Sequence, residues 1–132
     1  MYHTFNIKTP SRTAMVEITS KVQEIVEQSQ TKSGICTIFI PHTTAGITIN
    51  ENADSDVVED ILKETNKIIP FCDNYAHVEG NSAAHIKASL FGFSLQVIIE
   101  EGRLVLGTWQ GIYFCEFDGP RNRNVYVKII GD

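Results

Sequence analysis

The clearest strand in the sequence is the run Ile35-Cys36-Thr37-Ile38-Phe39-Ile40, which ends at Pro41. β-Branched and aromatic residues fill this run, and a proline cannot continue the hydrogen-bonded ladder of a strand. A second short strand is predicted at Ile47-Thr48-Ile49, where apolar and polar residues alternate. The two strands leave His42 in the turn that connects them.

Further strands are predicted on both sides of this pair. Residues 5–8 and 14–17 precede it, and residues 93–99, 104–117 and 125–130 follow it. The segment 104–117 is interrupted near Gly107 and Gly111. In the last segment, alternation places Val125, Val127 and Ile129 toward the core and the residues between them outward.

Three segments have the spacing of helices. Residues 19–30 carry apolar side chains at helical intervals, with Thr19 or Ser20 as the expected N-cap. Residues 52–69 have one apolar face and acidic residues at the start, where the helix dipole favours them. The third helix is expected to begin at Asn81, as its N-cap, and to end at Gly92.

The order of these elements predicts an α+β fold, because strands and helices do not alternate strictly. We expect a single compact domain over residues 1–132, a mostly antiparallel or mixed β-sheet sandwich with two or three helices. Tyr113, Cys115 and Phe117 alternate with Ile112 and Phe114, so both faces of that strand should be buried. A partner subunit or the chain's own helices could cover the second face.

Composition limits the classes of partner and the location. The formal net charge of −5 argues against a nucleic-acid or membrane-surface binder, and a local cluster of basic residues is still enough to hold a small phosphorylated molecule. The apolar runs are too short to span a membrane, and the N-terminus has no apolar signal-peptide region. The three cysteines form no CxxC pair and no disulfide framework. These features predict a cytoplasmic protein.

Three of the four histidines lie in sequences that suggest chemistry. His42 follows a strand end, and the hydroxyls of Thr43 and Thr44 could orient its imidazole or bind an oxyanion. The alternative is a turn in which the threonines bond their own backbone. His77 and His85 flank a segment of small residues, and a folded loop would bring His77 back toward the start of the third helix. Such a pair could supply two imidazoles to a metal, or each histidine could have a purely structural role.

Other candidate residues surround these histidines in the sequence. Glu51 could be a metal ligand, a partner for an imidazole N–H or a general base. Trp109, between glycines, could stack on a flat ring, or it could be a core tryptophan, and Gln110 could bond the edge of a heterocycle. Arg121 and Arg123 form the only basic loop and could bind phosphate, unless this loop is a solvated hairpin turn. P-loop, GxGxxG and GxSxG motifs are absent, which argues against nucleoside-triphosphate chemistry and Rossmann cofactors.

Four strings in order resemble the YjbQ-like family over nearly the whole chain. They are Pro41-His42-Thr43-Thr44-Ala45, the segment from Glu79-Gly80-Asn81 through His85-Ile86-Lys87-Ala88, Leu106-Gly107-Thr108-Trp109-Gln110, and Glu116-Phe117-Asp118-Gly119-Pro120-Arg121. The resemblance implies a compact α+β fold, a homotrimer, and a site near the subunit interface where the three histidines hold a metal ion or an anion. It also implies thiamine-phosphate synthase activity, described as a secondary activity, which joins hydroxymethylpyrimidine diphosphate to thiazole phosphate and releases diphosphate.

This activity suggests a role for each candidate residue. The catalytic residues would be His42, His77, His85 and Glu51, with the three histidines as ligands of a divalent metal ion. The substrate-binding residues would be Thr43, Thr44, Asn81, Lys87, Trp109, Gln110 and Arg121. Three neutral histidines fit zinc or a similar metal better than magnesium, whereas diphosphate chemistry usually uses magnesium. The metal would stabilise the leaving diphosphate with Arg121 and Lys87, and Trp109 would stack on the pyrimidine.

Two other functions are compatible with the same residues. One is a metal-dependent hydrolase of a small phosphorylated metabolite, in which the histidine site activates water. The other is a trimeric protein that binds a metal or a metabolite without turnover. Release of phosphate from generic esters would favour the hydrolase, and a stoichiometric metal without turnover would favour the binding protein.

Overall fold

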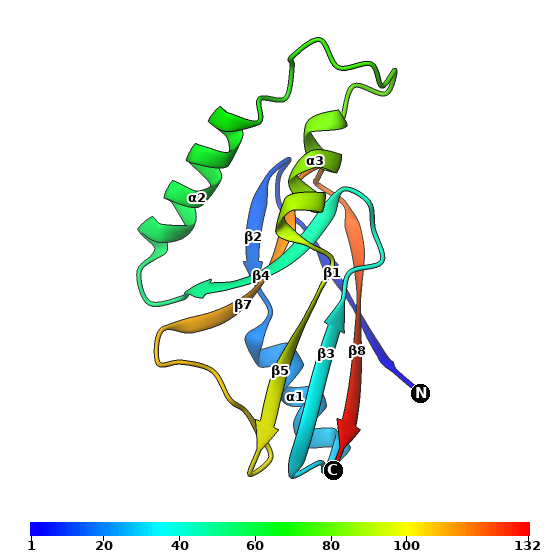
Figure 1. The fold of residues 1–132 in the computed structure, drawn as a ribbon, viewed down its shortest axis with the longest axis vertical. Coiled ribbons are helices and arrows are strands. Elements are labelled where there is room, and N and C mark those ends of the chain that lie inside the picture. The colour runs from blue at the N-terminus through cyan, green and yellow to red at the C-terminus, as the bar shows by residue number, and fades with distance from the viewer.

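Two antiparallel sheets form the centre of the protein, described here by a computed structural model that covers residues 1–132 (Figure 1). The first sheet has five strands in the order β1 (His3–Lys8), β8 (Asn122–Gly131), β3 (Ser33–Phe39), β5 (Ser94–Glu100) and β6 (Arg103–Leu104). The second has three, in the order β2 (Ala14–Glu17), β7 (Gln110–Glu116) and β4 (Ala45–Glu51). Every strand pair is antiparallel.

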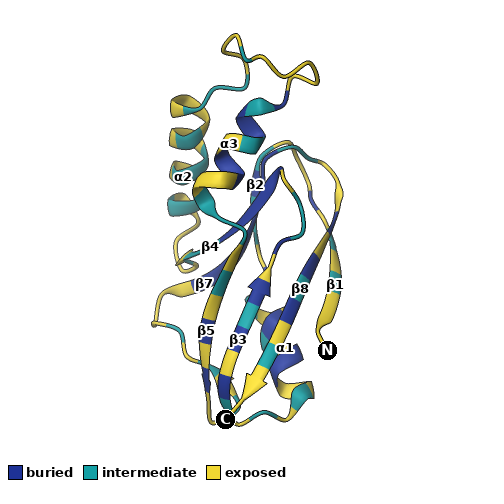
Figure 2. Ribbon diagram, turned by 45° about the vertical axis from the view of Figure 1, so that its right-hand side comes forward, coloured by how far each residue is buried: buried dark blue, intermediate teal, exposed yellow.

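Three helices complete the fold: α1 (Thr19–Ser29), α2 (Ser55–Ile68) and α3 (Ser82–Phe91). The prediction of a single α+β domain with antiparallel sheets and two or three helices is confirmed. Asp54 caps α2 as its side chain accepts a hydrogen bond from the backbone N–H of Asp56, so this helix begins later than predicted. Figures 1 and 2 both show α2 beside α3, above the sheets.

The main core lies between the inner faces of both sheets and α1. Along β3 and β8, buried and exposed residues alternate, which Figure 2 shows as changes of colour along each strand. Val125 and Val127 are fully buried and Ile129 is half-buried, as the alternation predicted. From the second sheet, Ile112 and Phe114 enter the same core, and α1 contributes Val22 and Val26. Burial of such side chains contributes roughly 1.5–3 kcal/mol each.

The second face of β7 is covered by the chain's own helix α3. Tyr113, Cys115 and Phe117 pack against Ala84 and Ala88 in a separate small cluster. The alanines let the helix approach the sheet closely. Both faces of this strand are therefore buried, as predicted, and no partner subunit is needed to cover it.

Two local predictions were wrong in detail. Ile18, not Thr19 or Ser20, occupies the N-cap position of α1, because the Thr19 hydroxyl instead bonds Glu17 and the backbone N–H of Ile112. The segment 104–117 is interrupted around Gly107, as predicted, since β6 ends at Leu104 and β7 starts at Gln110, but the second predicted interruption, near Gly111, does not occur. Gly111 lies inside β7, where a side chain would come within 2.6 Å of the Glu17 carboxylate.

The three cysteines are free thiols, as the absence of a disulfide framework predicted. Burial raises the pKa of Cys36 to about 11 and that of Cys115 to about 12, so neither forms a reactive thiolate near neutral pH. None of the helices has the length and apolar character that crossing a membrane requires.

Candidate functional site

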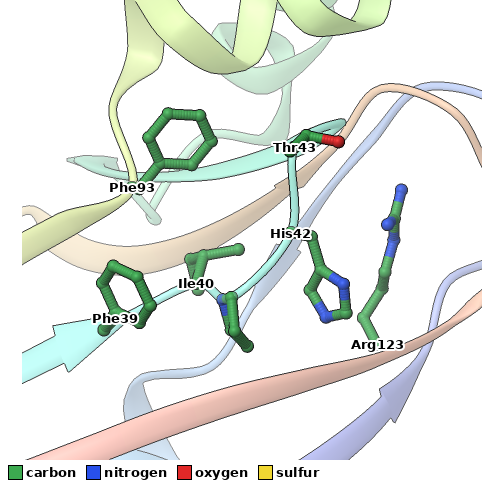
Figure 3. Close-up of a pocket in the computed structure, with 7 residues that line it drawn as sticks. Phe39, Ile40, His42, Thr43, Phe93 and Arg123 are labelled. Atoms are coloured by element: carbon green, nitrogen blue, oxygen red, sulfur yellow. The ribbon is translucent and has the colours of Figure 1, made fainter.

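A cavity of about 540 Å³ opens where β3 ends, and His42 lies on its wall (Figure 3). The remaining lining residues are Phe39, Ile40, Pro41, Thr43, Phe93 and Arg123. The backbone N–H of Asn124 donates to Nε2 of His42 at 2.9 Å, so the ring is neutral and carries its proton on Nδ1. Burial, together with the nearby charge of Arg123, lowers the pKa of His42 and favours this neutral form.

The sequence suggested that Arg123 lies in a basic loop. In the structure, this residue lies inside strand β8 and is buried. Its Nε donates to the carboxylate of the fully buried Glu116 at 2.8 Å, and another of its nitrogens donates to the hydroxyl of Thr44 at 2.8 Å. Thr9 donates a further hydrogen bond to Glu116 at 2.7 Å. This guanidinium is therefore committed to the protein itself, and so is the Thr44 hydroxyl that was predicted to bind substrate. Thr43 remains exposed at the cavity.

Opposing effects determine the ionisation of Glu116. Burial by itself raises the pKa of this carboxyl group. Hydrogen bonds from Arg123, Thr9 and the backbone N–H of Asp118, together with the charge of Arg123, outweigh burial and leave the pKa below its ordinary value. Nothing in the sequence indicated this pair, because its members come from two strands that lie in different sheets.

His77 and His85 meet as the sequence predicted. The loop after α2 brings His77 over the first turns of α3, and the two rings pack edge to face with centroids 5.5 Å apart. Nε2 of His77 lies 4.0 Å from the Glu79 carboxylate. Both histidines are accessible, since His77 is exposed and His85 is half-buried.

The chain by itself does not assemble a three-histidine metal centre. No group of three or more His, Cys, Asp or Glu side chains is arranged to hold a metal ion. The Nε2 lone pair of His42 is used by the hydrogen bond from Asn124, and a neutral imidazole has only one such lone pair. The role of His42, His77 and His85 as joint metal ligands therefore stays a prediction. The geometry of a single chain does not fit that role.

The start of α3 is tied to the turn after β7 by Asp118. Nδ2 of Asn81 donates to the Asp118 carboxylate at 2.9 Å, and Arg121 forms an ion pair with that carboxylate at 3.1 Å. Nε of Arg121 also donates to the Asp118 carbonyl at 2.8 Å. Asp118 was not among the predicted site residues, because its place before Gly119-Pro120 is typical of an ordinary turn.

Asn81 occupies the N-cap position of α3, as predicted, but its side chain does not cap the helix. The residue is only 9% exposed, and its Oδ1 has no hydrogen-bond partner. A buried acceptor without a partner is uncommon in folded proteins and costs about 1–3 kcal/mol. Asn81 therefore offers a free acceptor next to the Asp118–Arg121 pair.

Lys87 does not lie with His85 and Arg121. It follows His85 by two positions on α3, so its side chain leaves the helix about 200° away. Lys87 is 3% exposed, and its Nζ donates to Oδ1 of Asn66 on α2. Burial lowers its pKa.

Glu51, Trp109 and Gln110 lie together at the junction of β4 and β7, at the lower left of Figure 1, whereas the histidine-bearing loop is at the top. Trp109 is 64% exposed, so it is not a core residue. Oε1 of Gln110 accepts from the backbone N–H of Gly107 at 2.8 Å, which orders the loop that presents the indole. Within one chain, Trp109 does not meet the histidines.

Taken together, these features define a small α+β protein with two antiparallel sheets and polar site residues on separate loops. The chain belongs to the family described as UPF0047 protein YjbQ-like, whose family model matches residues 3–132. The resemblance found in the sequence is thereby confirmed.

Relatives at high identity cover the whole chain. A UPF0047 protein of Methanocaldococcus jannaschii, MJ1081, is 54% identical over 132 residues, which is 100% of this chain and 96% of the relative. YugU of Bacillus subtilis is 52% identical over 132 residues, which is 99% of this chain and 100% of the relative.

Two solved structures have the same fold. The structure of a family member from Clostridium acetobutylicum is 57% identical with a TM-score of 0.95 and covers 97% of this chain and 99% of its own. A protein of unknown function from Sulfolobus solfataricus is 36% identical, also with a TM-score of 0.95, and covers 100% of this chain and 97% of its own.

Proposed function

We propose that the protein binds a small phosphorylated molecule beside Asn81 and Arg121, and that it catalyses a transfer of the thiamine-phosphate synthase type. The observation that carries the proposal is the buried, unpartnered Oδ1 of Asn81 next to the Asp118–Arg121 pair. This amide oxygen would accept a hydrogen bond from an N–H or O–H group of a ligand once a neighbouring side chain moves aside, because the atom is buried in the free chain. The amino group of an aminopyrimidine is such a donor.

Arg121 supports a phosphorylated ligand. Its guanidinium is exposed, and the ion pair with Asp118 fixes its orientation while leaving other N–H groups free. Arg121 also lines a cavity of about 310 Å³ together with Lys8, a second cation. Two cations at one cavity suit an anionic group in a chain whose formal net charge is −5.

The proposed reaction needs charge stabilisation more than proton transfer. The ring nitrogen of the thiazole forms a bond to the methylene carbon of the pyrimidine, and the bond from that carbon to the diphosphate oxygen breaks. The diphosphate leaves with the electron pair, and the thiazole nitrogen becomes cationic. Arg121 would stabilise the charge of the leaving group, and no step of this reaction is assigned to a metal.

A homotrimer is part of the proposal, as the family resemblance implies. Trp109 is exposed and distant from the histidine loop of its own chain. In a trimer, Trp109 of one subunit would stack on a ring held by Asn81 and His85 of the next. Glu51 and Gln110 would accompany Trp109 in that arrangement.

The His77–His85 pair favours a second candidate, the metal-dependent hydrolase. Two adjacent, accessible imidazoles would supply two ligands of a metal site, and a third ligand would have to come from outside the single chain. This hydrolase would release inorganic phosphate, whereas the transferase releases diphosphate only when both substrates are present.

The test is an assay of thiamine-phosphate formation with the full chain, purified from a host without its own synthase. The variants are Asn81→Ala and Arg121→Gln, with Arg103→Gln, at an exposed position of β6, as the matched control. We expect turnover in the native and control proteins and a large loss in both site variants. Absence of turnover in the native protein rejects the transferase. Equal turnover in all variants rejects the proposed site.

A further inference from the structure

A separate cavity on the other side of α3 collects hydrogen-bond donors and cations. It has a volume of about 260 Å³ and lies between the loop after β1, the end of α2 and the middle of α3. Its lining residues are Arg12, Thr13, Asn66, Pro70, Phe71 and Lys87. No carboxylate lines this cavity.

Lys87 is a buried cation without an anionic partner. None of the three ion pairs in the structure includes it, and its Nζ donates only to the neutral amide oxygen of Asn66. The ring of Phe117, with its centroid 6.0 Å away, adds a weak attraction. Buried lysines in folded proteins are ordinarily paired with an acidic group, because an unpaired buried charge is costly.

The neighbouring side chains are arranged as donors as well. The central guanidinium carbon of Arg12 lies over the ring of Phe71, 3.9 Å from its centroid, and Arg12 forms no ion pair. Nδ2 of Asn66 donates to the hydroxyl oxygen of Thr13 at 3.2 Å, while its Oδ1 accepts from Lys87. Both ends of the Asn66 amide are therefore occupied, and the hydroxyl proton of Thr13 is free to donate.

We propose that this cavity binds a small phosphate oxyanion. The groups left free are the N–H donors of Lys87 and Arg12 and the O–H of Thr13, which match an anion whose oxygens are mainly hydrogen-bond acceptors. The cavity is smaller than most sites for drug-sized ligands, and its size suits a phosphate group or free phosphate. The site does not depend on the transferase activity and lies on the opposite side of α3 from His85.

The test titrates inorganic phosphate into the full chain by calorimetry, with the ¹⁵N resonance of the Lys87 ammonium as a local probe. We expect Arg12→Gln and Lys87→Met each to weaken binding about tenfold or more. Lys67→Met, at an exposed position next to Asn66, is the control and should bind like the native chain. Methyl phosphate is titrated in parallel, and tighter binding than inorganic phosphate indicates a phosphorylated metabolite as the natural occupant.

A second readout separates binding from a structural role of Lys87. A bound anion stabilises the ammonium, so phosphate should raise the pKa of Lys87 in the native chain, and less so in Arg12→Gln. Arg12 is exposed, so its variant should fold normally. The proposal is overturned if Arg12→Gln and Lys87→Met both bind phosphate with native affinity. It is also overturned if Lys67→Met loses as much phosphate affinity as these two variants. Asn81→Ala should leave the Lys87 response to phosphate unchanged, so failure of this site and failure of the transferase are distinguishable.

Discussion

The amide of Asn81 donates to the carboxylate of Asp118 at 2.9 Å, although the residues are 37 positions apart in the sequence. This bond links the N-cap position of helix α3 to the turn after strand β7. The same carboxylate holds Arg121 by an ion pair at 3.1 Å. Asp118 therefore positions two residues that the proposed function uses, while both retain free hydrogen-bonding groups.

Replacing Asp118 should impair the proposed site without rearranging the fold. In Asp118→Ala, the guanidinium of Arg121 loses its side-chain anchor, and Nδ2 of buried Asn81 loses its acceptor. We expect KM for the phosphorylated substrates to rise and the free energy of unfolding to fall by about 1–3 kcal/mol. Steady-state kinetics and denaturant unfolding measure the two effects. An unchanged KM would show that Asp118 does not position a binding residue.

Mixing two inactive variants tests whether the site is shared between subunits. Trp109→Ala and His85→Ala are each expected to lose activity, because each removes a different side chain from the shared site. When equal amounts are unfolded and refolded together, an intact site forms wherever a subunit with native His85 meets one with native Trp109. Random assembly of a ring predicts recovery of about a quarter of native activity. Light scattering checks that the mixture is a trimer, and no recovery in a trimer contradicts the shared site.

Breaking the buried ion pair between Arg123 and Glu116 should be strongly destabilising. Arg123→Met leaves an uncompensated carboxylate in the core, and we expect a loss of about 3–5 kcal/mol in the free energy of unfolding. Adding Glu116→Leu removes the orphaned charge and should recover part of that loss. Denaturant unfolding of the single and double variants measures both values. A cost below about 1 kcal/mol for Arg123→Met would mean that the pair behaves like a surface ion pair.

His42 should make the protein less stable in mild acid. Its pKa in the folded chain lies below the ordinary value of 6.5, because of burial and the charge of Arg123. As pH falls below 6.5, the unfolded chain takes up a proton that the folded chain resists, so the free energy of unfolding decreases. The contribution of neutral His42 to the free energy of unfolding is fully present above pH 6.5. It is lost as the pH falls toward the pKa that His42 has in the folded chain.

The measurement compares the native chain with His42→Gln, whose side-chain oxygen can still accept from Asn124, between neutral pH and pH about 5. The free energy of unfolding should decrease less over this pH range in His42→Gln than in the native chain. His3→Gln, at an exposed position of β1, should follow the native curve. Identical pH dependence in all three proteins would contradict the lowered pKa of His42.

The sequence by itself determined the class of fold and most of its elements. The run of β-branched and aromatic residues at 35–40, the alternation in residues 125–130 and the helical spacing in residues 19–30 are all local preferences of the sequence. The meeting of His77 and His85 was also predictable, because both lie on one short segment that turns back into a helix. The family strings are likewise contiguous, so they needed no tertiary information.

Only the tertiary structure decided which distant residues meet. Arg123 was predicted to lie in a basic loop, yet the strands that carry it and Glu116 bury both, and Asp118 became an anchor only because α3 packs on β7. Lys87 and His85 are near neighbours in sequence but leave α3 in opposite directions, so only Lys87 reaches the cavity beside Arg12. Sequence spacing reports local geometry, whereas a site depends on which faces the packing of helices and sheets brings together.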